Sequence, residues 1–143
     1  MDNFIIRIEN SYELCASANE LRQKVFIEEQ GVPDEEVFDE LNEGAVHIVI
    51  FDGKKPVATA RITHDEKWQI GLVAVEKNMR GWHLGEKVMQ AAIDYITKQA
   101  GEEIILSAQQ EVCGFYEKLG FKRYGEVTVF ESGFVLVPMR REI

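Results

Sequence analysis

The segment 72–86, LVAVEKNMRGWHLGE, constrains the fold of this chain more than any other. It begins as an apolar run typical of a strand, continues into a short loop that holds Arg80, Gly81 and Gly85, and passes directly into a helical pattern. The helix is predicted to be amphipathic, because the apolar residues between positions 88 and 96 recur at helical spacing. A chain built around such a strand–loop–helix unit is expected to combine a sheet with helices on its faces.

The loop of this segment has the chemistry of an anion-binding site. The first N–H groups of a helix have no partners within the helix, and the helix dipole adds positive potential there. Glycines let the backbone approach a ligand closely, and Arg80 can donate a forked contact to phosphate oxygens. The loop lacks both GxGxxG and Gly-Lys-Ser/Thr, which disfavours dinucleotide and nucleoside triphosphate sites. Taken alone, a plain strand-to-helix turn with a surface arginine explains the segment equally well.

Strands and helices alternate along the rest of the chain. The expected strands cover residues 4–8, 45–51, 57–63, 68–75, 103–107, 121–129 and 134–139, with a hairpin at Asp52-Gly53. The expected helices run from a cap at Asn10 or Ser11 to Gly31, over residues 85–100, and over residues 112–119 before Gly120. This order predicts an α+β (α/β mixed) fold: a single domain over residues 1–143 with a central, mostly antiparallel, twisted sheet of six to seven strands.

The composition and net charge of the chain indicate which kinds of ligand it can bind. The 143 residues are 45% hydrophobic, which is enough for one core, and the formal net charge of −9 disfavours nucleic acid and membrane surfaces. Such a charge suits a cationic or amine-bearing small molecule. Cys15 and Cys113 form neither a disulfide framework nor a zinc-ligand spacing, so no metal is expected. The N-terminal MDNFIIRIEN is not typical of a signal peptide or a membrane span, and we expect a cytoplasmic protein.

Residues 28–43 carry eight acidic side chains and no lysine or arginine. A solvated acidic loop is one interpretation of this run. The other is a negatively charged wall beside a site that receives a cation. The sequence leaves both open.

Three ordered motifs resemble the GNAT N-acetyltransferases, and within them an ElaA-like branch. The stretch 80–85, RGWHLG, is similar to the family's coenzyme A pyrophosphate loop, Gln/Arg-x-x-Gly-x-Gly/Ala. The stretch 115–121, FYEKLGF, resembles the family's FYxKxGF segment, and 22–33, RQKVFIEEQGVP, resembles the branch's RxxVFxxEQGVP opening. Asp39-Glu40 and His47 also match the branch. The resemblance covers nearly the whole chain and implies a GNAT fold with about four helices flanking the sheet.

The resemblance also implies a cosubstrate, acetyl-coenzyme A, and the residues that hold it. The strand backbone at Val73, Ala74 and Val75 would pair with the pantetheine arm, and Phe115 and Tyr116 would lie near the sulfur. The pyrophosphate would be surrounded by the loop and the first turn of the helix, namely Arg80, Gly81, Trp82, His83, Leu84, Gly85 and Glu86. The implied activity is direct acetyl transfer, in a ternary complex, to the primary amine of a small molecule. A homodimer is the family-level expectation.

Acetyl transfer needs a neutral amine and a proton for the departing thiolate. Tyr116 is the candidate acid, because a phenol stays protonated at neutral pH. Glu28 and Glu29 are weak candidates for the base, as are the acidic residues after Pro33. His47 is a further candidate, although a histidine that opens an apolar strand more often serves packing.

Two positions depart from the family pattern. His83 stands where the loop usually has its first glycine, and Leu136 stands where ElaA-like sequences often have a histidine that could act as a base. These departures motivate an alternative, a coenzyme A-binding or sensing module with little catalysis. A third hypothesis is an acetyltransferase for protein lysines or N-termini, in which the acidic run would dock a basic partner.

Overall fold

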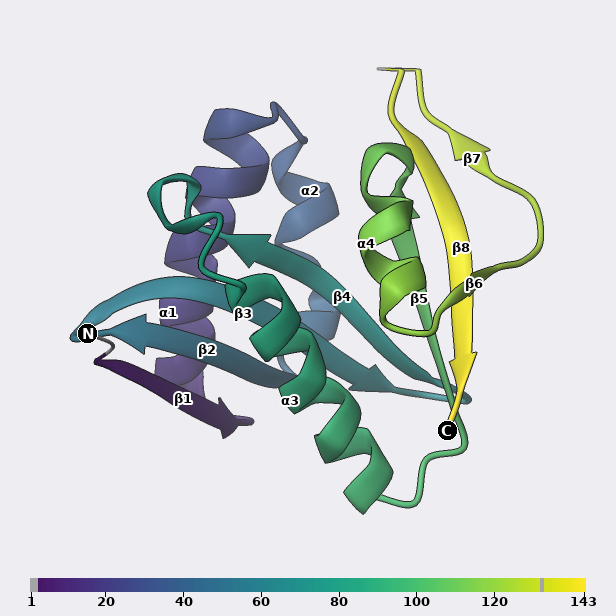
Figure 1. Cartoon of the computed structure of the whole chain (residues 1–143). Helices are drawn as coiled ribbons and strands as arrows, with labels where there is room; N and C mark the ends of the chain where they lie inside the picture. Colours follow the sequence, from purple (N-terminus) through teal and green to yellow (C-terminus); the bar gives the residue numbers. More distant parts are fainter. Residues whose placement is uncertain (1–2, 132) are drawn as a thin grey trace.

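The computed structural model describes residues 3–131 and 133–143, in which one mixed sheet is covered by helices on both faces (Figure 1). The strands are β1 (Phe4–Glu9), β2 (Val46–Asp52), β3 (Lys55–His64), β4 (Trp68–Val75), β5 (Glu103–Gln109), β6 (Lys122–Arg123), β7 (Thr128–Val129) and β8 (Val135–Glu142). The helices are α1 (Tyr12–Arg22), its π-helical continuation η1 (Gln23–Glu29), α2 (Asp34–Val37), α3 (Leu84–Lys98) and α4 (Cys113–Lys118), with short 3₁₀ turns η2 (Glu40–Asn42), η3 (Lys77–Met79) and η4 (Gln110–Val112).

The predicted mixed fold class is confirmed. The strands lie in the order β1-β2-β3-β4-β5-β8-β6, with β7 paired to β8, and every pairing is antiparallel except β4 with β5. The sheet has eight strands rather than six or seven, because the strand expected over 121–129 is two short strands, β6 and β7. Between them Gly125 has a left-handed backbone (φ 69°), which interrupts the extended conformation.

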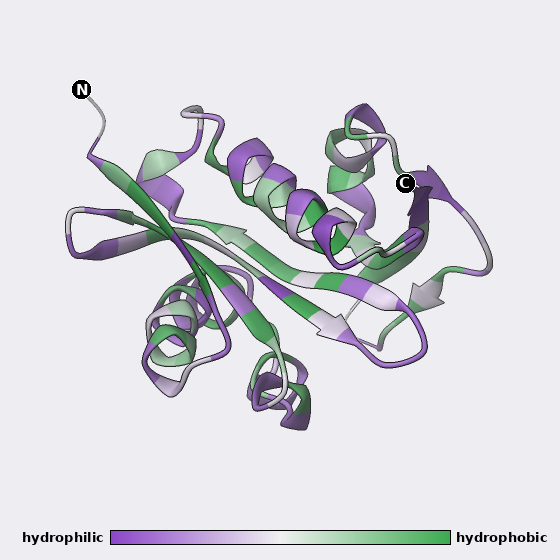
Figure 2. Cartoon of the chain, turned by 90° about the horizontal axis from the view of Figure 1, so that it is seen from below, coloured by the Kyte–Doolittle hydropathy of each residue, from purple (hydrophilic) through white to green (hydrophobic). Residues whose placement is uncertain are grey.

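Alternate residues of the sheet face different helices. In β2, Ile48 and Ile50 belong to the main core under α3, whereas Val49 between them packs with Leu14 and Ala18 of α1. This period of two follows from strand geometry. Figure 2 shows apolar residues on the helix faces that meet the sheet and polar residues outside. No helix of the described residues is long and apolar enough to cross a membrane.

Strands β4 and β5 separate soon after they meet. Their parallel pairing covers only Trp68 with Ile104 and Gln69 with Ile105, although β4 continues to Val75. Two residues of β4, Leu72 and Val73, lie opposite the single residue Ala60 of β3, and the φ of 48° at Leu72 marks this bulge. The bulge bends β4 away from β5, so the two strands diverge in Figure 1. The β5-facing edge of β4 is therefore left without a ladder beyond Gln69.

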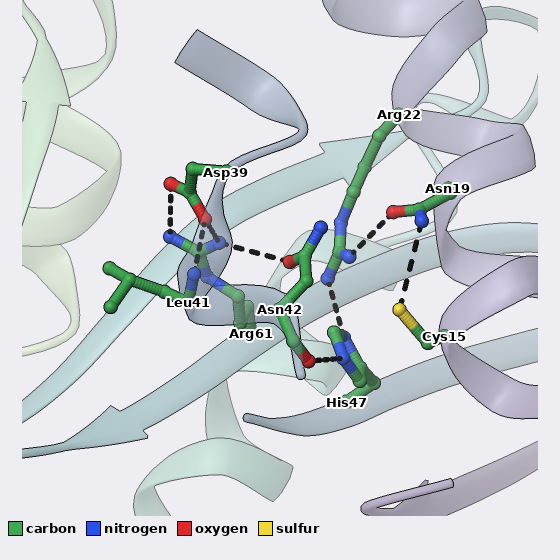
Figure 3. A network of polar contacts seen from close by, with 8 residues as sticks. All are labelled: Cys15, Asn19, Arg22, Asp39, Leu41, Asn42, His47 and Arg61. Atoms are coloured by element: carbon green, nitrogen blue, oxygen red, sulfur yellow. Dashed lines mark hydrogen bonds and ion pairs between the residues drawn. The ribbon is translucent and has the colours of Figure 1, made fainter. Parts of the chain in front are cut away.

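A buried polar network ties the acidic segment to the sheet (Figure 3). Arg22, fully buried, donates from Nη2 to His47 Nδ1 (3.1 Å), and His47 Nε2 lies 3.1 Å from the Asn42 carbonyl. Because a guanidinium only donates, Nδ1 must accept and Nε2 must donate to Asn42. Arg61 holds Asp39 through two contacts of 2.6 and 3.3 Å. His47 is thus a structural residue that helps to fix the loop 39–42.

This network makes folding sensitive to acid. Burial and the Arg22 cation lower the pKa of His47 to about 4, below its ordinary 6.5. The unfolded chain binds this proton first, so the contribution of His47 is fully present above pH 6.5 and is lost as the pH falls towards 4. The loss amounts to about 3 kcal/mol at most.

We expect His47→Gln, which can still accept from Arg22 and donate to Asn42, to show a smaller loss of stability between pH 7.5 and pH 5 than the wild type. Urea unfolding at both pH values measures the difference. The same pH dependence in both proteins would assign the acid sensitivity to other groups.

Candidate active site

A cavity of about 920 Å³ lies where β4 and β5 part. Its walls are the backbone and side chains of 70–75 and 106–109, together with the loop before α3. Nearly all the residues predicted to contact the coenzyme line it: Val73, Ala74, Val75, Arg80, Gly81, His83, Leu84, Gly85, Glu86, Phe115 and Tyr116. Trp82 does not. It is half exposed and packs edge-on against Phe4 of β1, with ring centroids 6.2 Å apart.

The start of α3 is open to a ligand. Gly81 has φ 97°, and a side chain added there would meet no atom within 4 Å, so the backbone is accessible. His83 is the N-cap residue and adopts a left-handed conformation, φ 61°. Such a backbone conformation costs a residue other than glycine about 1–2 kcal/mol. The imidazole points outward and lies 3.1 Å from Glu86 Oε1.

Gly85 brings α3 and α4 together beside the cavity. A Cβ at this position would lie 3.2 Å from the Phe115 ring and 3.7 Å from Val75. Phe115 in turn packs edge-on against Tyr116, with centroids 5.0 Å apart. The glycine of the loop thus sets how closely the FYEKLGF segment approaches the end of β4.

Arg80 and Glu29, predicted to have separate roles, meet in the structure. Arg80 donates from Nη1 and Nη2 to the two carboxylate oxygens of Glu29, at 2.7 and 2.8 Å, and from Nε to the Val75 carbonyl at 3.2 Å. The paired guanidinium lowers the pKa of Glu29, which makes this carboxylate a poorer base. Glu28 and Glu29 lie outside the lining of the main cavity and border a smaller hollow of about 260 Å³.

Tyr116 combines access to the cavity with a stable proton. Its side chain lines the cavity although the residue is only 8% exposed. Burial, with a smaller effect of Cys113, raises the pKa of Tyr116 to about 12. Its hydroxyl is therefore protonated at every physiological pH and can donate to a developing negative charge.

Sequence reasoning missed much of the remaining wall. Phe130 and Phe134 flank the turn between β7 and β8, where Phe130 N–H donates to the Phe134 carbonyl at 2.9 Å. Gln109 of β5 donates to Gln30 across the cavity at 2.7 Å. The acidic run was not missed: it contributes Glu35, Glu36 and Asp39 to the lining, as expected if the run forms a negatively charged wall. These groups come from separate segments, and no local spacing relates them. Among the described residues no group of three or more His, Cys, Asp or Glu is arranged to hold a metal.

Comparisons with known proteins agree with this geometry. Residues 11–143 match the family model of the acetyltransferase (GNAT) domain. YjcF of Bacillus subtilis, described as an uncharacterised N-acetyltransferase, is 30% identical over 136 residues, which cover 94% of this chain and 97% of that protein.

Solved structures share the architecture. The crystal structure of Escherichia coli ElaA superposes with a TM-score of 0.86 at 25% identity, covering 99% of this chain and 100% of that one. An aminoglycoside 6'-N-acetyltransferase crystallised with coenzyme A has a TM-score of 0.74 at 18% identity, covering 96% of each chain. The latter likeness concerns the fold alone.

The left-handed His83 leads to a first prediction for this site. Without ligand, His83→Gly should be more stable by roughly 0.5–1 kcal/mol, because relief of backbone strain exceeds the entropic cost of glycine. Coenzyme A should bind the variant more weakly than it binds the wild type, because an imidazole N–H that can donate to a phosphate is lost.

Ala100→Gly is the matched control, since Ala100 also has a positive φ (62°) but lies outside the cavity lining. Thermal unfolding and calorimetry at pH 6 and 8 measure both effects. A gain in coenzyme affinity that does not change with pH would contradict a phosphate contact by His83.

The ion pair leads to a second prediction. Glu29 competes with any phosphate for Arg80, so Glu29→Gln should tighten coenzyme A binding about 2- to 5-fold, as expected for an exposed ion pair. Glu28→Gln removes the same charge next to it and should have little effect. Calorimetry at low and moderate salt measures the three dissociation constants. Equal tightening by both variants would indicate a general charge effect.

Proposed function

The chain belongs to the GNAT acetyltransferase family, and from this premise we propose that it transfers the acetyl group of acetyl-coenzyme A directly to the primary amine of a small molecule. The observation that carries the proposal is a single cavity that joins the open start of α3, the unpaired edge of β4 and the hydroxyl-bearing Tyr116. A concave cavity of about 920 Å³ can hold two reactants side by side, which favours a small amine over the surface of a protein acceptor.

The residues present fit acetyl-coenzyme A. The bare backbone at Gly81 and the first N–H groups of α3 suit the pyrophosphate, and the free edge of β4 suits the amide-bearing pantetheine arm. When bound, the cosubstrate supplies an activated thioester. The chain's contribution is to hold that thioester beside the amine and to handle charge and protons.

Each step of the acetyl transfer can be assigned to a group that lines the cavity. A carboxylate of the acidic segment, Glu35 or Glu36, takes the ammonium proton directly or through water, since both line the cavity. A backbone N–H of the stretch 72–75 stabilises negative charge on the carbonyl oxygen while the nitrogen–carbon bond forms. Tyr116 gives its proton to the sulfur as the carbon–sulfur bond breaks, and solvent restores it.

Release of free thiol from acetyl-coenzyme A that depends on an added amine tests this function, and Tyr116→Phe tests the acid. We expect the variant to lower kcat about 10- to 10³-fold with coenzyme affinity nearly unchanged, because a hydroxyl is lost and the ring remains. Since burial raises the pKa of Tyr116 to about 12, the wild type should keep its activity up to about pH 10.

Phe115→Leu serves as the control for disturbed packing around the ring. Full activity of Tyr116→Phe would leave the family and the coenzyme site standing and would make Tyr116 a packing residue. Binding of coenzyme A without thiol release for any amine would favour a sensing module instead. Acetylation confined to protein lysines or N-termini would favour a macromolecular acceptor.

A further inference from the structure

The part of the cavity that lies away from the residues predicted to contact the coenzyme is lined mainly by apolar side chains. It is formed by η1 with the following loop, by α2, and by the β7–β8 hairpin. Helix α2 and this hairpin stand on opposite sides of the split between β4 and β5 (Figure 1). We call it the acceptor half. Its apolar side chains are Phe26, Val32, Val37, Phe130, Phe134 and Leu136.

These apolar groups are incompletely covered. The three phenylalanines and Leu136 line the cavity and are half-buried. Their free surface gains stability when an apolar ligand removes it from water. Leu136 places a further apolar side chain on this wall.

Three polar side chains beside the acceptor half already have hydrogen-bond partners. Gln30 and Gln109 are hydrogen-bonded at 2.7 Å, and Asp39 is held by Arg61 at 2.6 Å. A sugar-like ligand could donate to Glu35 and Glu36, but its remaining hydroxyls would have to displace these bonds or stay unpaired, and both cost free energy.

The charges of the cavity exclude one class of amine. Its basic lining residues are Arg80 and His83, both in the loop before α3, and Arg80 is already paired with Glu29. The acceptor half instead carries Glu35 and Glu36. Within residues 3–131 and 133–143 neither has a cationic side chain at ion-pair distance. A carboxylate on the acceptor would therefore meet negative charge and no partner.

We propose that the acceptor is a lipophilic primary amine: an amino group on an aromatic or branched aliphatic body that bears no carboxylate. The apolar body occupies the surface between η1 and the β7–β8 hairpin. The ammonium lies towards α2, where Glu35 or Glu36 attracts it and takes its proton. The inference rests on the proposed acetyl transfer and adds the class of its acceptor.

A matched set of amines tests the class in the wild-type protein. 2-Phenylethylamine is compared with ethylamine, which lacks the ring, and with phenylalanine, which adds a carboxylate; glucosamine and spermidine represent polyhydroxylated and polycationic amines. We expect kcat/KM for 2-phenylethylamine to be at least ~10-fold higher than for ethylamine, because the ring is buried in the acceptor half. It should be at least ~100-fold higher than for phenylalanine, because the carboxylate of phenylalanine finds no cationic partner there.

Variants then locate the binding surface. Phe134→Ala and Phe130→Ala should each raise KM for 2-phenylethylamine about 10-fold and leave KM for acetyl-coenzyme A unchanged. Val129→Ala is the control, because Val129 is exposed on the same hairpin and lies outside the cavity lining. Thermal unfolding without ligand shows whether each variant is folded.

The outcomes separate the two proposals. Acetylation of glucosamine, spermidine or phenylalanine in preference to 2-phenylethylamine would overturn the lipophilic class and leave acetyl transfer standing. Calorimetric binding of 2-phenylethylamine without thiol release would support the class and overturn acetyl transfer. Unchanged KM values in both folded phenylalanine variants would overturn the assignment of the acceptor half.

Discussion

The departure of β4 from β5 is the constraint on which the rest of this structure depends. A continuous parallel ladder would fill the edge of β4 with hydrogen bonds and leave no room between the strands. The bulge at Leu72, with its left-handed φ of 48°, ends that ladder after Gln69. The unsatisfied backbone groups then need partners, and a ligand that carries amides can supply them. The early end of the β4–β5 ladder thus determines both the shape of the sheet and the place where a ligand can bind.

The position of the acidic segment depends on contacts made by a buried arginine, Arg22. Arg22 is fully buried, and among the described residues it forms no ion pair with a carboxylate and its Nε has no hydrogen-bond partner. Burial and the neighbouring Arg61 lower the pKa of Arg22 to about 9. Such a cation is tolerated because His47 and Asn19 accept from it, and His47 in turn holds the Asn42 carbonyl. This chain of contacts fixes the loop 39–42, which directly follows the helix that bears Glu35 and Glu36.

Local patterns in the sequence predicted the elements that local forces build. The cap at Ser11 is observed as a bond from Leu14 N–H to its hydroxyl at 3.1 Å, and β4 covers the expected residues 68–75. The bulge at Leu72 escaped prediction, because leucine has no preference for positive φ. The Arg80–Glu29 pair spans 51 positions, and the aromatic wall comes from segments about a hundred residues apart. Those contacts depend on tertiary packing, which a single sequence does not encode in its spacing.

The Arg80–Glu29 pair changes how the anion site must work. A guanidinium already neutralised by a carboxylate adds little net charge, and the chain as a whole carries −9. Attraction for a phosphate then has to come from neutral groups: the N–H dipoles at the start of α3 and the bare backbone at Gly81. Dipoles act over a short range, so they can hold an anion at one end of a cavity without opposing a cation at the other. An amine can consequently approach Glu35 and Glu36 from the acceptor half without repulsion from a strong positive field.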